Sequence, residues 1–470
     1  MSQQNKTAGE LLAEQLCYKP ENAGILMGED ELKQAFDFCE GYKTFLDMAK
    51  TEREAVEYTE NLLQKNGFEL FDPQKAYQPG DKIYLNNRGK ALIIAAIGKR
   101  SLSEGVRIVA SHIDSPRIDL KQRPLYEEAQ LAMLKTHYYG GVRKYQWVTI
   151  PLALHGVIIK KDGTTVQVSI GESQDDPVFC INDLLPHLSR EQNKRPLHEG
   201  IKGEELNVLV GSLPFKDDKA SEKVKLHILK LLFEKYGIIE ADFLSAELSL
   251  VPAFKARDLG LDRSMVGAYG HDDRVCAYTS LMACLNHPQP EYTWVNILAD
   301  KEETGSDGNT GLNSRFLEHF IQDLAGSQRL EGRHVLEKSE CLSADVNAAF
   351  DPTFPDVHEK KNACYLNYGA VMSKYTGAGG KGGTNDASAE FVGRIRRIFD
   401  EAGVVWQTAE LGKVDAGGGG TVAKFISRLG ADVVDIGVPV LSMHSPFEVV
   451  AKTDVYQAYK AFGAFVSNKA

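Results

Sequence analysis

The pattern of apolar and polar positions changes twice along the chain, and each change marks a different kind of structure. The first 70 or so residues have helical spacing, and Thr51 with Glu54 forms the start signal of a helix that runs towards Asn66-Gly67. Residues 83–98 alternate as a hairpin with its turn near Arg88-Gly89. The short apolar run 106–110 is typical of a strand that is buried on both faces of a sheet.

From about residue 118 to residue 252 the pattern consists of short strands and turns. Asp162-Gly163 is a hairpin turn signal between two of these strands. One amphipathic helix is predicted over 217–237, where a glycine ends it. The pattern therefore predicts that this stretch forms a separate β-rich unit.

From about residue 255 onward, strands and helices alternate again. The prediction places helices at 273–285 and 386–402, and strands at 293–300, 403–408 and 432–442. Together the pattern predicts the α/β class, with one domain split into residues 1–117 and 253–470 and a β-rich insertion at 118–252.

Composition and charge exclude several classes of binding partner. The 470 residues carry 65 acidic and 54 basic side chains, a formal charge of −11, with no long basic stripe. Neither a nucleic acid nor an anionic membrane is therefore expected as a partner. No stretch is apolar for ~18 residues and the first twenty residues lack the apolar centre of a signal peptide, so a cytoplasmic protein is expected.

The seven cysteines are scattered and none forms a CxxC pair. They are expected to be reduced and mostly buried, because neither a disulfide framework nor a thiolate zinc site has this spacing. Any metal site must therefore use histidine and carboxylate ligands.

Histidines and carboxylates do occur where a metal site would form. In an open α/β sheet, sites assemble at the carboxyl ends of strands. Four segments follow predicted strands and one begins a predicted helix: His112-Ile113-Asp114, Glu302-Glu303, Asp345, His444, and Asp272-Asp273 at the helix. All five could meet in one crevice.

This set suits zinc or a similar divalent ion, and a shared carboxylate could build a two-metal site. Of the tandem Glu302-Glu303, one could be a ligand and the other a general base. Asp114 stands two residues after His112 and could orient its imidazole. Taken singly, each segment is more often structural: an HxD is a short motif, and acidic pairs commonly cap helices or compensate their dipoles.

Two glycine-rich stretches offer a different interpretation. Residues 377–382 satisfy GxGxxG, a nucleotide-binding hint, but the bare pattern is permissive. It also fails as a phosphate-binding P-loop, because Gly382 follows Lys381 where Ser or Thr is required. For residues 377–382, a flexible loop over a peptide-binding pocket is the preferred interpretation. Residues 416–420 are predicted to form a tight loop that enters a helix, and their backbone amides could bind a substrate carbonyl or carboxylate.

Five motifs in order resemble those of the aspartyl aminopeptidase family, which includes vacuolar aminopeptidase I and belongs to the clan MH co-catalytic metallopeptidases. They are ASHIDSPR, GHDDRVCA, DKEETGS, SADVNAAFDP and MHSPFEVVAKTD. The resemblance spans essentially the whole chain. It implies a zinc-exopeptidase-like mixed central sheet flanked by helices, with an inserted β-rich domain for dimerisation and substrate capping.

The same resemblance assigns the ligands. It implies that His112, Asp272 and Asp345 hold one metal, and that Asp272 bridges to a second held by Glu303 and His444. The expected ions are two zinc per subunit, with cobalt or manganese as alternatives.

Further roles follow from the family pattern. Glu302 is expected to be the general base and Asp114 the residue that orients His112. His187, in the insertion, is expected to reach a neighbouring subunit's active site, and Lys374 to lie near the substrate. A homo-oligomer is expected, with dimers assembling into a dodecamer.

The expected function is a metal-dependent aminopeptidase that removes an acidic or a neutral N-terminal residue from peptides. Lys374 and Lys381 are the candidates for a cationic pocket that would favour acidic residues. A related carboxypeptidase or N-acyl amino acid deacylase is the alternative, because such enzymes have nearly the same ligands. A non-catalytic oligomeric scaffold is a third possibility, against which the complete ligand and base set argues.

Overall fold

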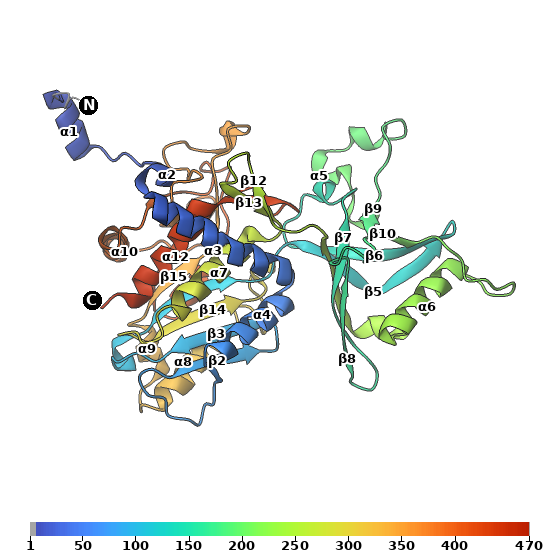
Figure 1. Cartoon of the computed structure of the whole chain (residues 1–470), viewed down its shortest axis with the longest axis horizontal. Coiled ribbons are helices and arrows are strands. Elements are labelled where there is room, and N and C mark those ends of the chain that lie inside the picture. Colours follow the sequence, from blue (N-terminus) through green and yellow to red (C-terminus); the bar gives the residue numbers. More distant parts are fainter. Residues whose placement is uncertain (1–5, 470) are drawn as a thin grey trace.

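The buried apolar runs lie side by side in one central sheet of nine strands (Figure 1). The computed structural model describes residues 6–469. In spatial order the strands are β1 (Glu69–Leu70), β2 (Lys82–Asn87), β3 (Ala91–Ala96), β14 (Trp294–Ala299), β4 (Arg107–His112), β15 (Glu340–Ala344), β19 (Asp432–Gly437), β17 (Ala370–Ser373) and β18 (Trp406–Thr408). Every residue of β3, β4 and β14 is buried, as expected for strands covered on both faces.

The sheet is mixed. Strands β14, β4, β15 and β19 run parallel, whereas β3 is antiparallel to β14 and β17 is antiparallel to β19. The four parallel strands end at one edge, which is the edge that carries the predicted ligands. The predicted α/β class with a mixed central sheet is confirmed.

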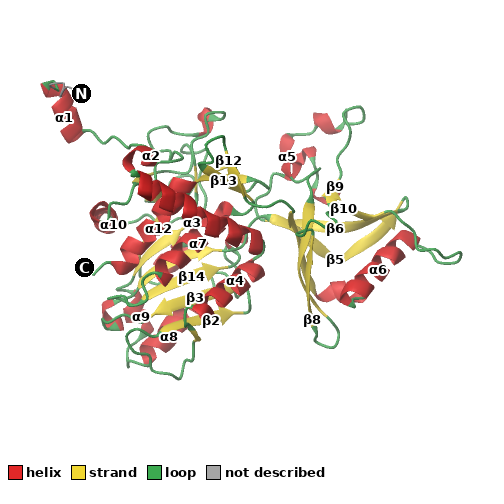
Figure 2. Cartoon of the chain, in the orientation of Figure 1, coloured by secondary structure: helices red, strands yellow, loops and turns green. Residues whose placement is uncertain are grey.

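Helices cover both faces of this sheet (Figure 2). One face packs against α3 (Glu29–Met48), α4 (Glu52–Lys65), α7 (His271–Leu285), α10 (Ala389–Glu401) and α12 (Lys452–Ser467). The other face packs against α8 (Phe316–Gly326), α9 (Gly332–Leu336) and α11 (Ala423–Ser427). Before them come α1 (Ala8–Leu16), which extends away from the body of the chain, and α2 (Ala23–Leu26).

A second sheet of seven strands forms the other part of the molecule (Figure 1). Its order is β8 (Thr165–Ile170), β7 (Leu152–Ile159), β11 (Ala246–Pro252), β5 (Arg117–Glu128), β6 (Leu131–Tyr139), β10 (Val208–Gly211) and β9 (Cys180–Ile181). Helix α6 (Lys223–Tyr236) packs against it, and the short α5 (Leu197–Gly200) lies in the loop before β10. We call this part, whose strands all lie between residues 117 and 252, the inserted unit.

A small third sheet was not predicted. Its five strands are β12 (Arg257–Leu259), β13 (Met265–Ala268), β21 (Glu448–Ala451), β20 (Pro439–Leu441) and β16 (Asn347–Ala348). It matters for function because His444 lies in the loop between β20 and β21.

Local signals fix several elements where the sequence places them. The side chain of Thr51 accepts a hydrogen bond from the backbone of Glu54, and the Glu54 carboxylate accepts one from the backbone amide of Thr51, which starts α4 at Glu52. Arg88 and Gly89 both have positive φ (62° and 67°), the conformation of the tight turn between β2 and β3.

Other predicted bounds differ from the structure. The helix predicted over 217–237 begins only at Lys223, because Asp217 accepts hydrogen bonds from the next turn's amides and Glu222 is left-handed. The strand predicted over 432–442 is two strands, since the chain leaves the central sheet after Gly437 and joins the third sheet. The helix predicted from 386 begins at Ala389 because Ser388 caps it.

A partly buried ionic cluster around His155 joins α4 to the inserted unit. His155 of β7 lies between Glu54 (Nδ1 to Oε1, 2.6 Å) and Glu172 (Nε2 to Oε1, 2.9 Å). Glu172 also pairs with Lys50 and Lys255, at 2.7 Å each. Burial disfavours a charged imidazole, but the two glutamates outweigh it and raise the pKa of His155 to about 9.

This cluster predicts a pH-dependent stability. The folded pKa of His155 lies above its unfolded value of ~6.5, so the stabilisation is complete below pH ~6.5 and is lost as the pH rises through about 9. We expect the metal-free protein to lose about 3 kcal/mol of unfolding free energy from this group between pH 6 and 9.5. Denaturant titrations of His155→Gln should lack that part of the pH dependence, whereas the exposed His137→Gln should keep it. Equal pH dependence in the two variants would contradict the assignment.

No helix within residues 6–469 combines the length and the apolar character needed to cross a lipid bilayer.

Candidate metal centre

His112 is the last residue of β4 and its side chain is fully buried. Its Nδ1 lies 3.0 Å from the backbone oxygen of Asp114 and 3.3 Å from that residue's Oδ1. These contacts hold the ring from one side and leave Nε2 directed at the other carboxylates. Asp114 is itself fully buried.

Asp272 lies between two imidazoles. It stands at the start of α7, in backbone geometry that is not helical, and the peptide bond to Asp273 is cis. Its Oδ1 is 3.2 Å from His112 Nε2 and its Oδ2 is 3.0 Å from His444 Nε2. One carboxylate thus presents one oxygen to each histidine, which is the arrangement that a shared ligand of two ions requires.

Glu302 and Glu303 form the short 3-10 turn η6 (Glu302–Thr304) just beyond β14. Their backbone amides donate to the two carboxylate oxygens of Asp114, at 3.1 and 3.2 Å. Glu303 Oε2 lies 3.5 Å from His444 Nε2, and Glu302 Oε2 lies 3.9 Å from His112 Nε2. The two neighbouring glutamates therefore face opposite ends of the cluster.

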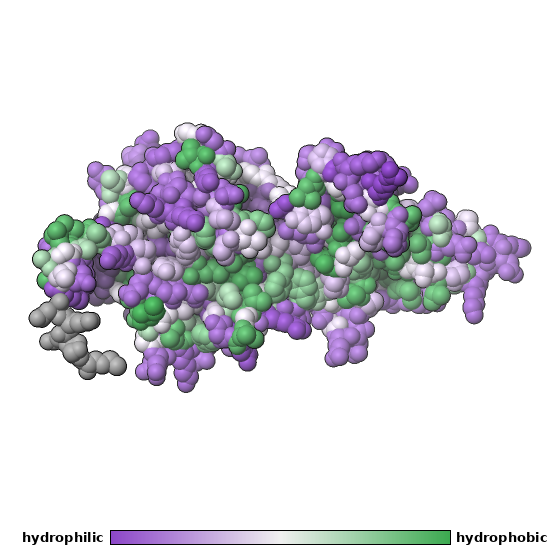
Figure 3. Space-filling model, turned by 90° about the horizontal axis from the view of Figure 1, so that it is seen from above, coloured by the Kyte–Doolittle hydropathy of each residue, from purple (hydrophilic) through white to green (hydrophobic). Residues whose placement is uncertain are grey.

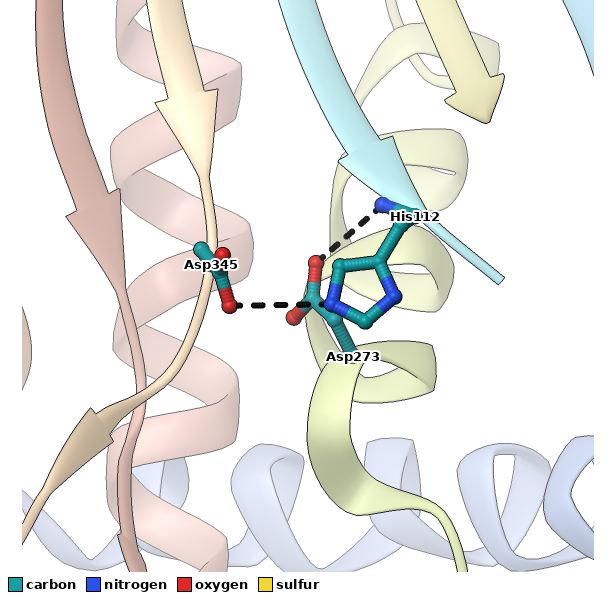
Figure 4. A group of neighbouring side chains, drawn as sticks. All are labelled: His112, Asp273 and Asp345. Atoms are coloured by element: carbon teal, nitrogen blue, oxygen red, sulfur yellow. Dashed lines mark hydrogen bonds and ion pairs between the residues drawn. The ribbon is translucent and has the colours of Figure 1, made fainter. Parts of the chain in front are cut away.

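Asp345 directly follows β15, and its Oδ1 lies 3.8 Å from His112 Nε2 (Figure 4). Figure 4 also shows Asp273, which comes from α7 and accepts a hydrogen bond from the backbone amide of His112 at 3.4 Å. Asp273 lies in a segment that the sequence marked as a candidate, although only Asp272 was expected to be a ligand. Its full burial beside His112 and Asp345 makes it part of the centre.

The residues fit a metal centre because several buried polar atoms lack other partners. His112 Nε2, Asp272 Oδ1, Asp273 Oδ1 and Glu303 Oε1 are buried and accept or donate no hydrogen bond within residues 6–469. Unpaired buried polar atoms are rare in folded proteins and call for an explanation. Ligand atoms of three sets lie mutually within 4.8 Å: His112, Asp273 and Asp345; His112, Glu302 and Glu303; and Asp272, Glu303 and His444. Imidazole with carboxylate is a donor set that zinc accepts.

The pKa shifts of the buried acids and of His444 also fit a metal centre. Burial raises the pKa of Glu302, Glu303 and Asp345, and neighbouring carboxylates raise it further. Burial alone would lower the pKa of His444, but Asp272, Glu303 and Glu448 raise it to about 10. So many acids in one buried place need positive charge for balance, which divalent cations would supply.

A cavity of about 460 Å³ opens in front of these carboxylates. Gly418–Gly420, Thr421 and Phe425 line its far wall, together with Lys424 of α11. The Lys424 ammonium lies 4.8 Å from the Phe425 ring, and no carboxylate within residues 6–469 pairs with it. Lys424 was not predicted from the sequence, because its place just after the glycine-rich stretch 416–420 does not show that it reaches the cavity.

The two lysines singled out in the sequence lie elsewhere. Lys374 and Lys381 both pair with Asp386, at 2.5 and 3.0 Å, and neither lines the cavity. His187 is exposed in a loop of the inserted unit, away from the cavity of its own chain. The adjacent His271 takes no part either, because Tyr42 and the Val266 carbonyl engage its two ring nitrogens.

The glycine-rich loops pack together beside the cavity. The amide of Gly419 donates to the Thr376 carbonyl at 2.9 Å, and a Cβ on Gly418 would come within 2.5 Å of the Ala378 backbone. Gly418–Gly420 of the second loop line the cavity, whereas of the first loop only the preceding Thr376 does.

A mixed sheet with histidines and carboxylates gathered at the ends of its parallel strands, around one shared aspartate, defines a metallohydrolase of the co-catalytic type.

Comparison with known proteins gives the family. The family model described as aminopeptidase I zinc metalloprotease (M18) matches residues 45–466. A curated relative from Clostridium acetobutylicum, named "Probable M18 family aminopeptidase 1", is 50% identical over 455 residues, 95% of this chain and 98% of the relative. The crystal structure of an M18 family aminopeptidase from Thermotoga maritima superposes with a TM-score of 0.91 at 44% identity, covering 96% of this chain and 99% of that one.

The chain belongs to the M18 family of zinc metalloproteases, so it is a metal-dependent aminopeptidase and the family predicted from the five motifs is confirmed. A more distant neighbour, the structure of the Saccharomyces cerevisiae mApe1 dodecamer, shares the fold with a TM-score of 0.75 at 22% identity, covering 93% of this chain and 97% of that one.

Proposed function

We propose that this enzyme removes the N-terminal residue of peptides with two zinc ions held around Asp272. His112, Asp272 and Asp345 would hold one ion, and Asp272, Glu303 and His444 the other. The observation that carries this proposal is the position of Asp272, whose two oxygens lie 3.2 and 3.0 Å from the imidazoles of His112 and His444.

Zinc in such a site polarises the scissile carbonyl and acidifies water. The side chain left for proton transfer is Glu302, which faces the cavity and is not needed as a ligand. It would take the proton of the attacking water and deliver it to the nitrogen of the leaving peptide. Asp114, held by the amides of Glu302 and Glu303, would fix His112 and this turn relative to each other.

A substrate panel tests this function. Aminoacyl-arylamides should be hydrolysed in the presence of zinc and should no longer be hydrolysed after chelation. A carboxypeptidase or a deacylase, the alternative that the ligands alone leave open, would instead cleave peptides from the other end or N-acyl amino acids. Absence of any zinc-dependent hydrolysis would leave only the scaffold interpretation.

The unpaired Lys424 supports a preference for acidic N-terminal side chains. A substrate carboxylate would supply the partner that this ammonium lacks, and a charge-assisted hydrogen bond contributes ~1.5–3 kcal/mol. We therefore expect Lys424→Met to lower kcat/KM for aspartyl and glutamyl arylamides about tenfold or more. The leucyl arylamide should change little. Lys413→Met, an exposed lysine outside the cavity, is the matched control. An equal loss on all substrates would show that Lys424 does not select acidic residues.

We also propose that the inserted unit mediates assembly into homo-oligomers. Its surface exposes many large apolar side chains (Figure 3), among them Val178, Leu184, Leu188, Leu197 and Leu213. His187 belongs to the same exposed loop as Leu184 and Leu188, as a residue that reaches a neighbouring subunit must. The dodecamer and the role of Lys374 stay predictions.

A further inference from the structure

Two strands run from the metal centre into the inserted unit and back. β5 begins at Arg117, five residues after His112, and β6 returns antiparallel to it and ends at Tyr139. Arg117 pairs with Tyr139 in the register of this hairpin. The segment Tyr139–Gly141 therefore lies at the end of this return strand, where Gly141 lines the cavity in front of the metal ligands.

Tyr139 contacts the end of the centre that contains His112. Its hydroxyl donates to Asp114 Oδ2 at 2.7 Å, beside the amides of Glu302 and Glu303. The Tyr139 ring is held in place by the Arg117 guanidinium, 4.1 Å from its centroid. Tyr139 thus fixes the carboxylate that faces the His112 imidazole.

Gly141 contacts the opposite end. Its carbonyl oxygen accepts a hydrogen bond from His444 Nδ1 at 3.1 Å, and this bond directs His444 Nε2 towards Asp272 and Glu303. A Cβ on Gly141 would come within 3.1 Å of His444 Nδ1. Gly140 between them has a φ of +74° and lies against Glu303, where a Cβ would come within 3.2 Å of that side chain.

We infer that Tyr139–Gly141 is a positioning segment, through which the inserted unit orients one ligand group at each end of the metal centre. This inference rests on the proposed two-zinc site. Tyr139 acts through Asp114, and Gly141 acts through His444. The inserted unit therefore contributes to metal binding within its own chain, apart from any part it has in assembly.

Zinc titration of the metal-free enzyme against a chromophoric chelator tests the inference. Losing a partner that orients a metal ligand typically weakens metal binding ~10–100-fold. We expect Tyr139→Phe to weaken one of two zinc equivalents about tenfold. Gly141→Ala, which displaces His444 without removing a backbone group, should also weaken one equivalent, and the double variant should weaken both. The neighbouring Tyr138→Phe is the matched control, because that ring is 40% exposed and has no contact with the centre.

A second readout separates positioning from general structural damage. The thermal midpoint of the metal-free Tyr139→Phe protein should fall, because Asp114 loses one buried hydrogen bond. The rise in the midpoint on adding zinc should also be smaller than in the unaltered chain, which a purely structural loss would not cause. If Tyr139→Phe and Gly141→Ala both bind two zinc ions with unchanged affinity, the inference is overturned. If the unaltered chain itself fails to bind two zinc ions, the proposed function fails instead, so the two failures are distinguishable.

Discussion

Glu302→Gln should bind two zinc ions as the unaltered enzyme does and lose between about 10²- and 10⁴-fold of kcat. The amide has nearly the shape of the carboxylate but cannot accept a proton from water. Glu302 Oε2 lies 3.9 Å from His112 Nε2, whereas Asp272 Oδ1 lies 3.2 Å from it. Replacing the Glu302 carboxylate should therefore leave the metal ligands in place.

Zinc content by mass spectrometry and steady-state kinetics on one arylamide check this expectation. Glu318→Gln, a half-buried glutamate on α8 away from the cavity, is the matched control and should be unchanged in both measurements. Retained turnover in Glu302→Gln would remove this residue from its role as base. Loss of zinc would instead make it a ligand.

Asp272→Asn should lose metal and activity together. The neutral amide cannot present two anionic oxygens to the two ions, so zinc binding should fall from two equivalents to at most one, and kcat/KM by at least about 10³-fold. The variant also leaves His112 and His444 without the carboxylate that lies between them.

Asp273→Asn is the informative comparison, because it alters the neighbouring acid in the same buried segment. It should retain the ion bound by Asp272, Glu303 and His444. If Asp273→Asn released both ions and Asp272→Asn released neither, the shared ligand would be Asp273 and the proposed ligand set would be wrong.

The sequence predicted the elements whose signals are local. The reciprocal contact of Thr51 and Glu54 and the turn at Arg88-Gly89 each involve neighbours along the chain, and both occur as expected. Parallel strand ends also bring distant residues together in a predictable way, which is why His112, Asp345 and the Glu302-Glu303 pair were found.

What the sequence could not show depends on packing between distant segments. Gly437 and Pro439 are local signals of an interruption, but the move from the central sheet to the third sheet depends on distant packing, so one strand was expected where there are two. Tyr139 and Lys424 reach the site through the return of β6 and the position of α11. Their contacts with Asp114 and with the cavity join residues that are 25 or more positions apart, and no spacing rule connects them.

The proposed metal ligands lie on elements of two different sheets. His112 and Asp345 belong to the ends of central strands, whereas His444 belongs to the loop that links two strands of the small third sheet. A cation shared through Asp272 would therefore add a further link between the two sheets, beside the chain connections after Ala344 and Gly437 and the hydrogen bond from Asn347 of β16 to Ser373 of β17 at 2.7 Å. Removing a ligand of this shared cation would thus weaken a link between the two sheets as well as the chemistry.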